Sequence, residues 1–214
     1  MKFLPLLFLF VGAIAHADEP DTPLTINGCL IAESSQCPGA NLWGANLASQ
    51  DLRKMNLAGA DLRDADLRHA RLDLANLEKA QLQGANLNRA SLQQSNLRLA
   101  DFSGATLKAI QGWGLFAQGA QFQRADLSGA YLQFARLSGA RLHEANLQAA
   151  DLEMAWLSKA DLKGADLRDA NLQEVKLAES NLEQANLSGS RQHYGNFQDA
   201  NMQDCIGCPT SWDH

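Results

Sequence analysis

Large apolar residues recur at every fifth position along most of the chain. From Leu42 to Met202 this series has 33 positions, of which 26 are Leu, three are Phe and one is Met. Ala stands two places before the large residue in 24 of these repeats, and Asn or Asp usually lies between the two. Gly112, Ala117 and Gln192 depart from the series, but the register never slips. Such a fixed period indicates a repeat architecture.

A period of five residues predicts a stacked β-coil. It does not fit one face of an α-helix, where apolar positions recur about every 3.6 residues. In an extended segment, Ala and the large residue point to one side and the Asn or Asp points to the other. The remaining two residues, such as Ser138 and Gly139, are polar or Gly and suit a corner. Each pentapeptide should therefore form one side and one corner, and stacked coils bury a continuous apolar column.

The repeat A-(D/N)-L-x-x resembles the pentapeptide-repeat family. It is clear in Ala40–Leu42, Ala60–Leu62 and Ala160–Leu162, and the resemblance extends to about Asp204. It implies an all-β fold, a right-handed quadrilateral β-helix (solenoid) of about eight coils with 20 residues per coil. Two central residues that are 20 positions apart, Phe102 and Phe122, would then stack on each other.

The first residues are typical of a signal peptide. Lys2 precedes an apolar run from Phe3 to Ile14, and Ala15-His16-Ala17 matches a small-x-small cleavage site. The run is shorter than the ~20 residues that a membrane-spanning helix needs. We therefore expect cleavage after residue 17 and no membrane span in the mature chain. A retained N-terminal anchor is the alternative.

The rest of the chain divides around the repeat. We expect a flexible leader at residues 18–28, because it begins with a polar segment that contains two prolines. An N-terminal cap at residues 29–39, the β-helix at 40–204 and a C-terminal cap at 205–214 follow.

The stretch from Ile110 to Ala117 is irregular and allows two interpretations. It could bulge from the rod as a loop, or it could stay in register. Ile110 stands two places before Gly112 and Leu115 two places before Ala117, so the volume lost at each central position is restored nearby. This compensation favours two distorted sides that keep the register.

Composition and charge exclude some functions. The chain has 18 basic and 24 acidic residues, and loss of residues 1–17 would leave 17 basic residues and a net charge of −7. This balance argues against unspecific attraction to nucleic acid or anionic lipid.

The histidines do not indicate a catalytic or metal site. Four of them fall at outward or terminal positions, namely His69, His143, His193 and His214, and a filled solenoid offers no concave site. We therefore expect no enzyme activity, catalytic residue, metal or cofactor.

Four cysteines flank the repeat. Cys29 and Cys37 precede it, and Cys205 and Cys208 follow it. Cys205 and Cys208 could also form a redox pair or half a zinc site. An exported chain meets an oxidising compartment, where structural disulfides are common. A disulfide needs Cα atoms within about 7 Å, whereas the ends of the rod should be roughly 40 Å apart. We therefore predict two local bridges, Cys29–Cys37 and Cys205–Cys208.

One group of outward positions is unusually apolar and is our candidate binding patch. Phe134 and Met154 are 20 positions apart at the same corner, and Arg136 and Trp156 are 20 positions apart on the next side. Tyr131 lies just before this corner, and Phe116 joins the second column if the register holds. Exposed apolar patches often mark binding sites, and aromatic residues and Arg are enriched in interfaces. Local packing, a homodimer contact, or a foreign partner or glycan would each explain the patch.

The sequence favours a non-catalytic binding or scaffolding rod that is exported to the periplasm or the extracellular space. Its partner would be an unknown protein or an envelope component, not a nucleic acid. The resemblance offers an alternative, because some family members are thought to inhibit DNA-processing enzymes by mimicking DNA with an acidic rod. The signal peptide argues against this alternative, since such a target is cytoplasmic.

Overall fold

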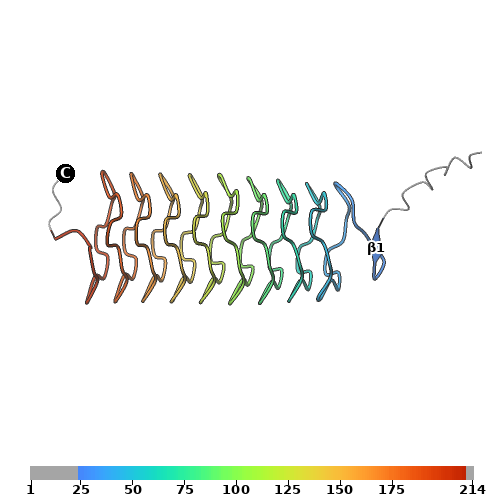
Figure 1. The fold of residues 1–214 in the computed structure, drawn as a ribbon, viewed down its shortest axis with the longest axis horizontal. Coiled ribbons are helices and arrows are strands. Elements are labelled where there is room, and N and C mark those ends of the chain that lie inside the picture. The colour runs from blue at the N-terminus through green and yellow to red at the C-terminus, as the bar shows by residue number, and fades with distance from the viewer. Residues whose placement is uncertain (1–23, 211–214) are drawn as a thin grey trace, which may run out of the picture.

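The protein is a straight rod of stacked, four-sided coils (Figure 1). The computed structural model describes residues 24–210. Each outward residue of the repeat forms a parallel β-bridge with the residue 20 positions later, from Gln36 with Asn56 to Asn186 with Ile206. The bridges continue without a gap at every fifth position, so one coil contains four pentapeptides. The all-β solenoid with four pentapeptides in each coil is therefore confirmed.

Backbone hydrogen bonds explain why coils of this sequence stack. The N–H of the central Leu42 donates to the carbonyl of Asp61 in the next coil over 2.7 Å, and the N–H of Asp61 donates back to Ala40 over 2.9 Å. A third bond closes the corner, from the N–H of Ala45 to the carbonyl of Leu42 over 3.0 Å. The extended side thus pairs with neighbouring coils while the corner satisfies its own backbone.

The corner also explains the preference for Asn or Asp. The Asn41 side-chain oxygen accepts a hydrogen bond from the N–H of Trp43 over 3.2 Å, and the same bond recurs in most repeats. A short polar side chain can hold such a turn, whereas a longer one reaches past it. The last corner residue adopts a left-handed conformation, as in a type II turn, with φ 61° at Gly44.

The interior is a single apolar column. The central Leu residues and almost all of the Ala residues two places before them are inaccessible to solvent. Phe102 and Phe122 stack with their ring centroids 5.0 Å apart and their planes at 8°, as expected for neighbouring coils.

The irregular stretch stays in register. Gln111 pairs with Tyr131 and Phe116 pairs with Arg136 in the same ladder as all other repeats. A Cβ atom added at Gly112 would lie 2.6 Å from Leu115 Cδ2, so the Leu115 side chain occupies the space that a central residue normally fills. Ile110 is likewise buried. The loop interpretation is therefore wrong, and the compensation of volume is confirmed.

The N-terminal end differs from our expectation in two respects. Strand β1 (Thr25–Ile26) pairs with β2 (Cys29–Leu30) in an antiparallel hairpin, so the leader ends before residue 25 rather than at residue 28. Asn27 and Gly28 form its turn with φ 47° and 80°, as an Asn-Gly hairpin requires. The coil also begins before residue 40, because Cys37 is buried at a central position of the repeat.

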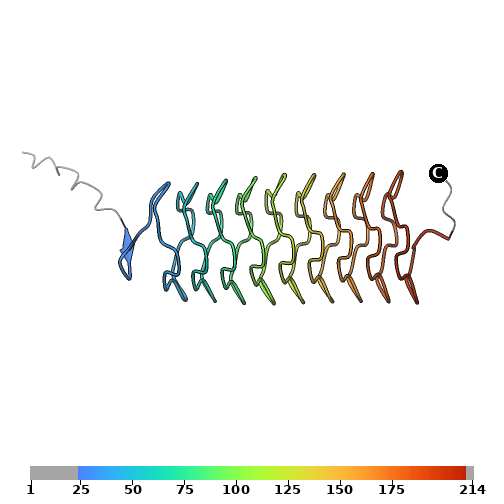
Figure 2. The ribbon, with the colours of Figure 1, turned by 180° about the vertical axis from the view of Figure 1, so that it is seen from behind.

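The first and last described segments of the chain, blue and red in Figure 2, lie at opposite ends of the rod. Each contains one cysteine pair. Cys29 is bonded to Cys37 with a Cα–Cα distance of 5.5 Å, and Cys205 to Cys208 with 5.8 Å. At the C-terminal end the ladder reaches Ile206, just beyond the expected limit at residue 204. The predicted signal peptide, most of the leader and the end of the C-terminal cap, residues 211–214, lie outside the described residues.

The buried column predicts which substitutions the fold tolerates. Leu127 and Leu147 are each 1% exposed, so Leu→Ala at either position should lower the free energy of unfolding by ~2–5 kcal/mol. Arg168→Ala removes only a surface ion pair with Asp166 and should have a small effect. Equilibrium unfolding in denaturant measures both. Equal losses for the Leu and Arg variants would contradict the assignment of inward and outward positions.

The irregular stretch makes a second prediction. Gly112→Ala should destabilise the rod by about 1–3 kcal/mol, because the new methyl group collides with Leu115 in a filled interior. The quadruple variant Ile110→Ala, Gly112→Leu, Leu115→Ala, Ala117→Leu restores the regular pattern on both sides and should unfold without this loss. Thermal unfolding of the three proteins tests the idea, and a Gly112→Ala variant as stable as the wild type would contradict it.

Candidate binding surface

The structure brings the predicted patch residues together around one corner of the rod. Phe134 and Met154 occupy this corner in adjacent coils, and Tyr131 lies on the side that precedes it. On the side that follows, Phe116 pairs with Arg136 and Arg136 pairs with Trp156. We call these six residues, together with Trp113, the aromatic corner.

Trp113 belongs to this surface although we did not predict it. Its ring lies 6.0 Å from the Phe134 ring, tilted by 60°, and it is 43% exposed. The signal was present in the sequence, because Trp113 is followed by Gly114, which stands 20 positions before Phe134. Once the irregular stretch is known to stay in register, the two aromatic residues must be neighbours.

The aromatic corner is accessible to solvent. Trp156 is 54% exposed, Tyr131 52% and Phe134 44%. Packing accounts for part of the surface, since Phe116 is half-buried and Phe134 contacts Trp113. Tyr131 and Trp156 form no ring–ring contact in the described part of the chain. Apolar surface of these side chains is therefore exposed to water and does not contribute to the buried core.

Two arginines are stacked on the rings of this surface. The Arg136 guanidinium lies 5.0 Å from the Phe116 ring centroid and 5.8 Å from that of Trp156. The Arg98 guanidinium lies 5.1 Å from the same Phe116 ring. We did not predict Arg98, which stands two places after Asn96, the neighbour of Phe116 in the preceding coil. Stacking of this kind fixes a flexible side chain in place.

Arginines that stand two places after an Asp form an ion pair with that Asp. In Asp-Leu-Arg repeats the guanidinium folds back onto the carboxylate, as in Arg63 with Asp61 at 2.6 Å. The Arg53 side chain hydrogen-bonds Asp51 in the same way and holds the pKa of that carboxyl down at about 2. Arg98 and Arg136 form no ion pair with any residue from 24 to 210, and neither do Arg89, Arg124, Arg141 and Arg191. Their charges remain available to a partner.

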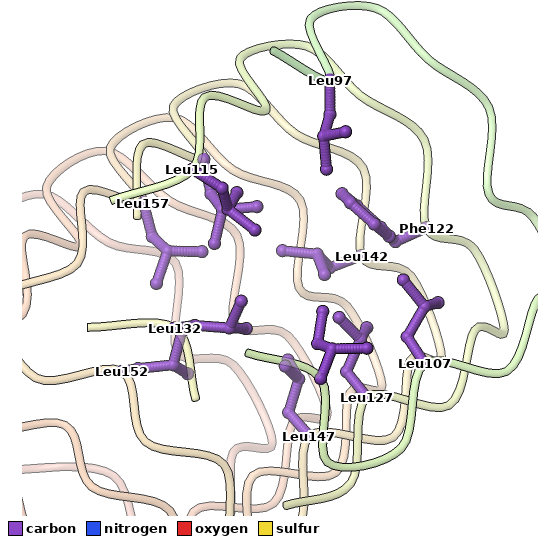
Figure 3. Close-up of a pocket in the computed structure, with 12 residues that line it drawn as sticks. Leu97, Leu107, Leu115, Phe122, Leu127, Leu132, Leu142, Leu147, Leu152 and Leu157 are labelled. Atoms are coloured by element: carbon purple, nitrogen blue, oxygen red, sulfur yellow. The ribbon is translucent and has the colours of Figure 1, made fainter. Parts of the chain in front are cut away.

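A void inside the rod lies beside the irregular stretch. It has a volume of about 10 Å3 and is lined by apolar side chains that point at one another, among them Leu97, Leu115 and Phe122 (Figure 3). Ligand pockets are typically ≈ 300–1,000 Å3. The void results from imperfect replacement of the two missing central side chains.

The described residues do not form a metal site. No three His, Cys, Asp or Glu side chains between positions 24 and 210 converge as a metal site would require. His143 contacts the neighbouring Glu144 at 3.3 Å, and His193 contacts Tyr194. In the same part of the chain, no helix is long and apolar enough to cross a membrane.

Comparison with known proteins identifies the family. A family model described as "Pentapeptide repeats" matches in 8 copies over residues 40–78, 75–109, 125–164 and 165–206. The chain therefore belongs to the pentapeptide-repeat family, and its fold is the family's right-handed quadrilateral β-helix. The interval without a match, between residues 109 and 125, contains the irregular stretch.

Several solved structures are similar. HetL from the cyanobacterium Nostoc sp. strain PCC 7120, involved in heterocyst differentiation regulation, is 30% identical over 81% of this chain and 87% of its own, with a TM-score of 0.43. QnrB1, a plasmid-mediated fluoroquinolone resistance protein, is 18% identical over 79% and 89%, with a TM-score of 0.44. A thylakoid lumen protein from Arabidopsis thaliana is 28% identical over 54% and 69%, with a TM-score of 0.22. No curated protein sequence matched the chain.

Proposed function

We propose that this protein is an exported, non-catalytic binding rod and that the aromatic corner is its contact surface. The observation that carries the proposal is the exposure of Tyr131, Phe134 and Trp156. They lie beside Arg98 and Arg136, which form no ion pair between residues 24 and 210. Exposed aromatic residues and arginines dominate the centres of interfaces. The solenoid supplies a rigid scaffold that presents these side chains without ordering a loop on binding.

Two features support export. The segment from Met1 to Ala17 has the composition of a cleavable leader. All four cysteines are bonded, two at each end of the rod, and such bridges persist in the periplasm or outside the cell. The bonds close the two ends, where an open β-helix exposes backbone edges that invite aggregation.

The acidic balance supports a second candidate, inhibition of a cytoplasmic DNA-processing enzyme by imitation of DNA. The chain has a net charge of −6, which has the sign that an anionic mimic needs. Arg136 at the aromatic corner and Arg98 beside it do not suit this role, because they place positive charge on the surface that would have to resemble phosphates. The two candidates also require different compartments.

Export predicts that the native protein begins at Asp18. N-terminal sequencing of protein from fractionated cells should find this start in the periplasmic or secreted fraction. A chain that starts at Met1 in the cytosol would contradict export and favour the DNA-mimic candidate.

The contact surface predicts a selective loss of binding. The double variant Trp156→Ala, Phe134→Ser should fold normally, because both side chains are outward, and should lose partners that the wild type captures from envelope extract. Light scattering checks whether the lost contact is a homodimer. The matched control is Trp43→Ala, which removes an exposed aromatic residue, 65% accessible, at a different corner near the N-terminal end of the rod. Unchanged mass and unchanged capture in the first variant would exclude the aromatic corner as the functional surface.

A further inference from the structure

The turn of the N-terminal hairpin contains an Asn that differs from every other Asn in the chain. Asn27 is the only one that is followed by Gly, whereas most of the others precede a Leu of the repeat. In an Asn-Gly pair the backbone nitrogen of the second residue can reach the side-chain amide of the first, because Gly has no side chain to block the approach. The turn is therefore a candidate for spontaneous covalent modification.

The nitrogen that would attack is accessible. Asn27 and Gly28 are both exposed, and nothing lies within 4 Å of the place where a Cβ atom of residue 28 would stand. The Gly28 N–H forms no hydrogen bond with any residue from 24 to 210. In most repeats, by contrast, the nitrogen after an Asn is engaged. The Leu187 N–H, which follows Asn186, donates to the Ile206 carbonyl over 2.7 Å.

The hairpin is short enough to open locally. Closure of a five-membered ring requires the Asn27 backbone to rotate out of its turn conformation, which has φ 47°. Strands β1 and β2 contain two residues each and form a sheet of two strands. Such a hairpin is marginally stable by itself, so local opening costs little free energy. The Cys29–Cys37 bridge anchors β2 but leaves the turn outside the loop that it closes.

Asn27 also caps the first coil. Its Nδ2 donates a hydrogen bond to the carbonyl oxygen of Asn41 over 2.8 Å. In the next coil the equivalent carbonyl, that of Asp61, accepts a hydrogen bond from the N–H of Leu42 in the coil before it. The Asn27 side chain thus supplies the donor that a preceding coil supplies elsewhere. A carboxylate at position 27 has no hydrogen to donate and would repel the Asn41 oxygen.

We propose that Asn27 is a site of spontaneous deamidation and that the reaction removes the cap of the first coil. The Gly28 nitrogen bonds to Asn27 Cγ, the Cγ–Nδ2 bond breaks, and the proton of the Gly28 N–H leaves with Nδ2 as ammonia. Water then opens the cyclic imide at either of its two carbonyls and yields aspartate or isoaspartate. The product leaves a backbone acceptor free at the N-terminal edge, where a strand of another molecule can pair.

The first test is incubation of the purified protein at neutral and at mildly alkaline pH, followed by non-reducing peptide mapping with mass spectrometry. We expect Asn27 to lose its amide before any other Asn, with aspartate and isoaspartate both present. The loss should be faster at the higher pH, because the attacking nitrogen must give up its proton. Asn186 is the internal control and should keep its amide. An amide that persists at Asn27, earlier loss at Asn186, or aspartate without isoaspartate would each overturn the proposed reaction.

The second test concerns the cap. Asn27→Asp removes the donor but keeps the turn, because Asp-Gly also favours a two-residue hairpin. We expect faster hydrogen exchange at the Ile31 N–H, which bonds to the Leu24 carbonyl beside the hairpin, and unchanged exchange at Leu187. Asn186→Asp is the matched control, since Asp already occupies the same column at residues 66, 126 and 166, and it should leave both rates unchanged. Exchange at Ile31 that is as slow in Asn27→Asp as in the wild type would overturn the role of Asn27 as a cap.

Discussion

The whole molecule depends on one packing constraint, which is that each pentapeptide places one large apolar side chain in the interior. Because this side chain and the preceding Ala are both buried, the backbone between them must be extended. The next two residues must then turn, so that the next large side chain also points inward. Stacking, bridges between coils and the outward direction of every other residue all follow from this constraint. Even at Gly112, where the central side chain is missing, Leu115 fills the space and the register persists.

This dependence explains how much of the structure could be predicted from sequence. The period alone predicted the sides and the corners, and the family resemblance supplied the number of sides. The Phe102–Phe122 stack followed from a coil of four pentapeptides. The hairpin of β1 and β2 was missed, because it lies outside the repeat and is specified by local turn chemistry at Asn27 and Gly28. A fixed period says nothing about the segments that flank it.

The candidate surface could be predicted only in part from the repeat. Positions that are one full coil apart must be neighbours, which was enough to group Phe134 with Met154 and Arg136 with Trp156. Contacts between different columns were harder to foresee, because they depend on side-chain rotamers. Arg98 reaches the Phe116 ring from the turn of the preceding coil, and Trp113 reaches Phe134 across one corner. Neither contact joins equivalent positions of adjacent coils.

Left-handed backbone conformations occur at most corners of the rod, at structural and at candidate functional residues alike. Phe134 and Met154 adopt left-handed conformations, with φ 58° and 56°, which cost roughly 1–2 kcal/mol in residues other than Gly. Many corner residues share this conformation, so strain alone does not mark a site. Leu99 shares it too, but its side chain covers the next coil at Gly119 and thereby contributes to packing.

The aromatic corner is different, because two left-handed apolar residues, Phe134 and Met154, occupy the same corner in adjacent coils. Met154 is only partly buried, and Phe134 remains exposed although Trp113 covers part of its ring. A Gly or a polar residue would satisfy the corner at less cost, as Gly114 does in the same column. The fold does not require apolar side chains at these two positions, and this agrees with the contact surface that we propose.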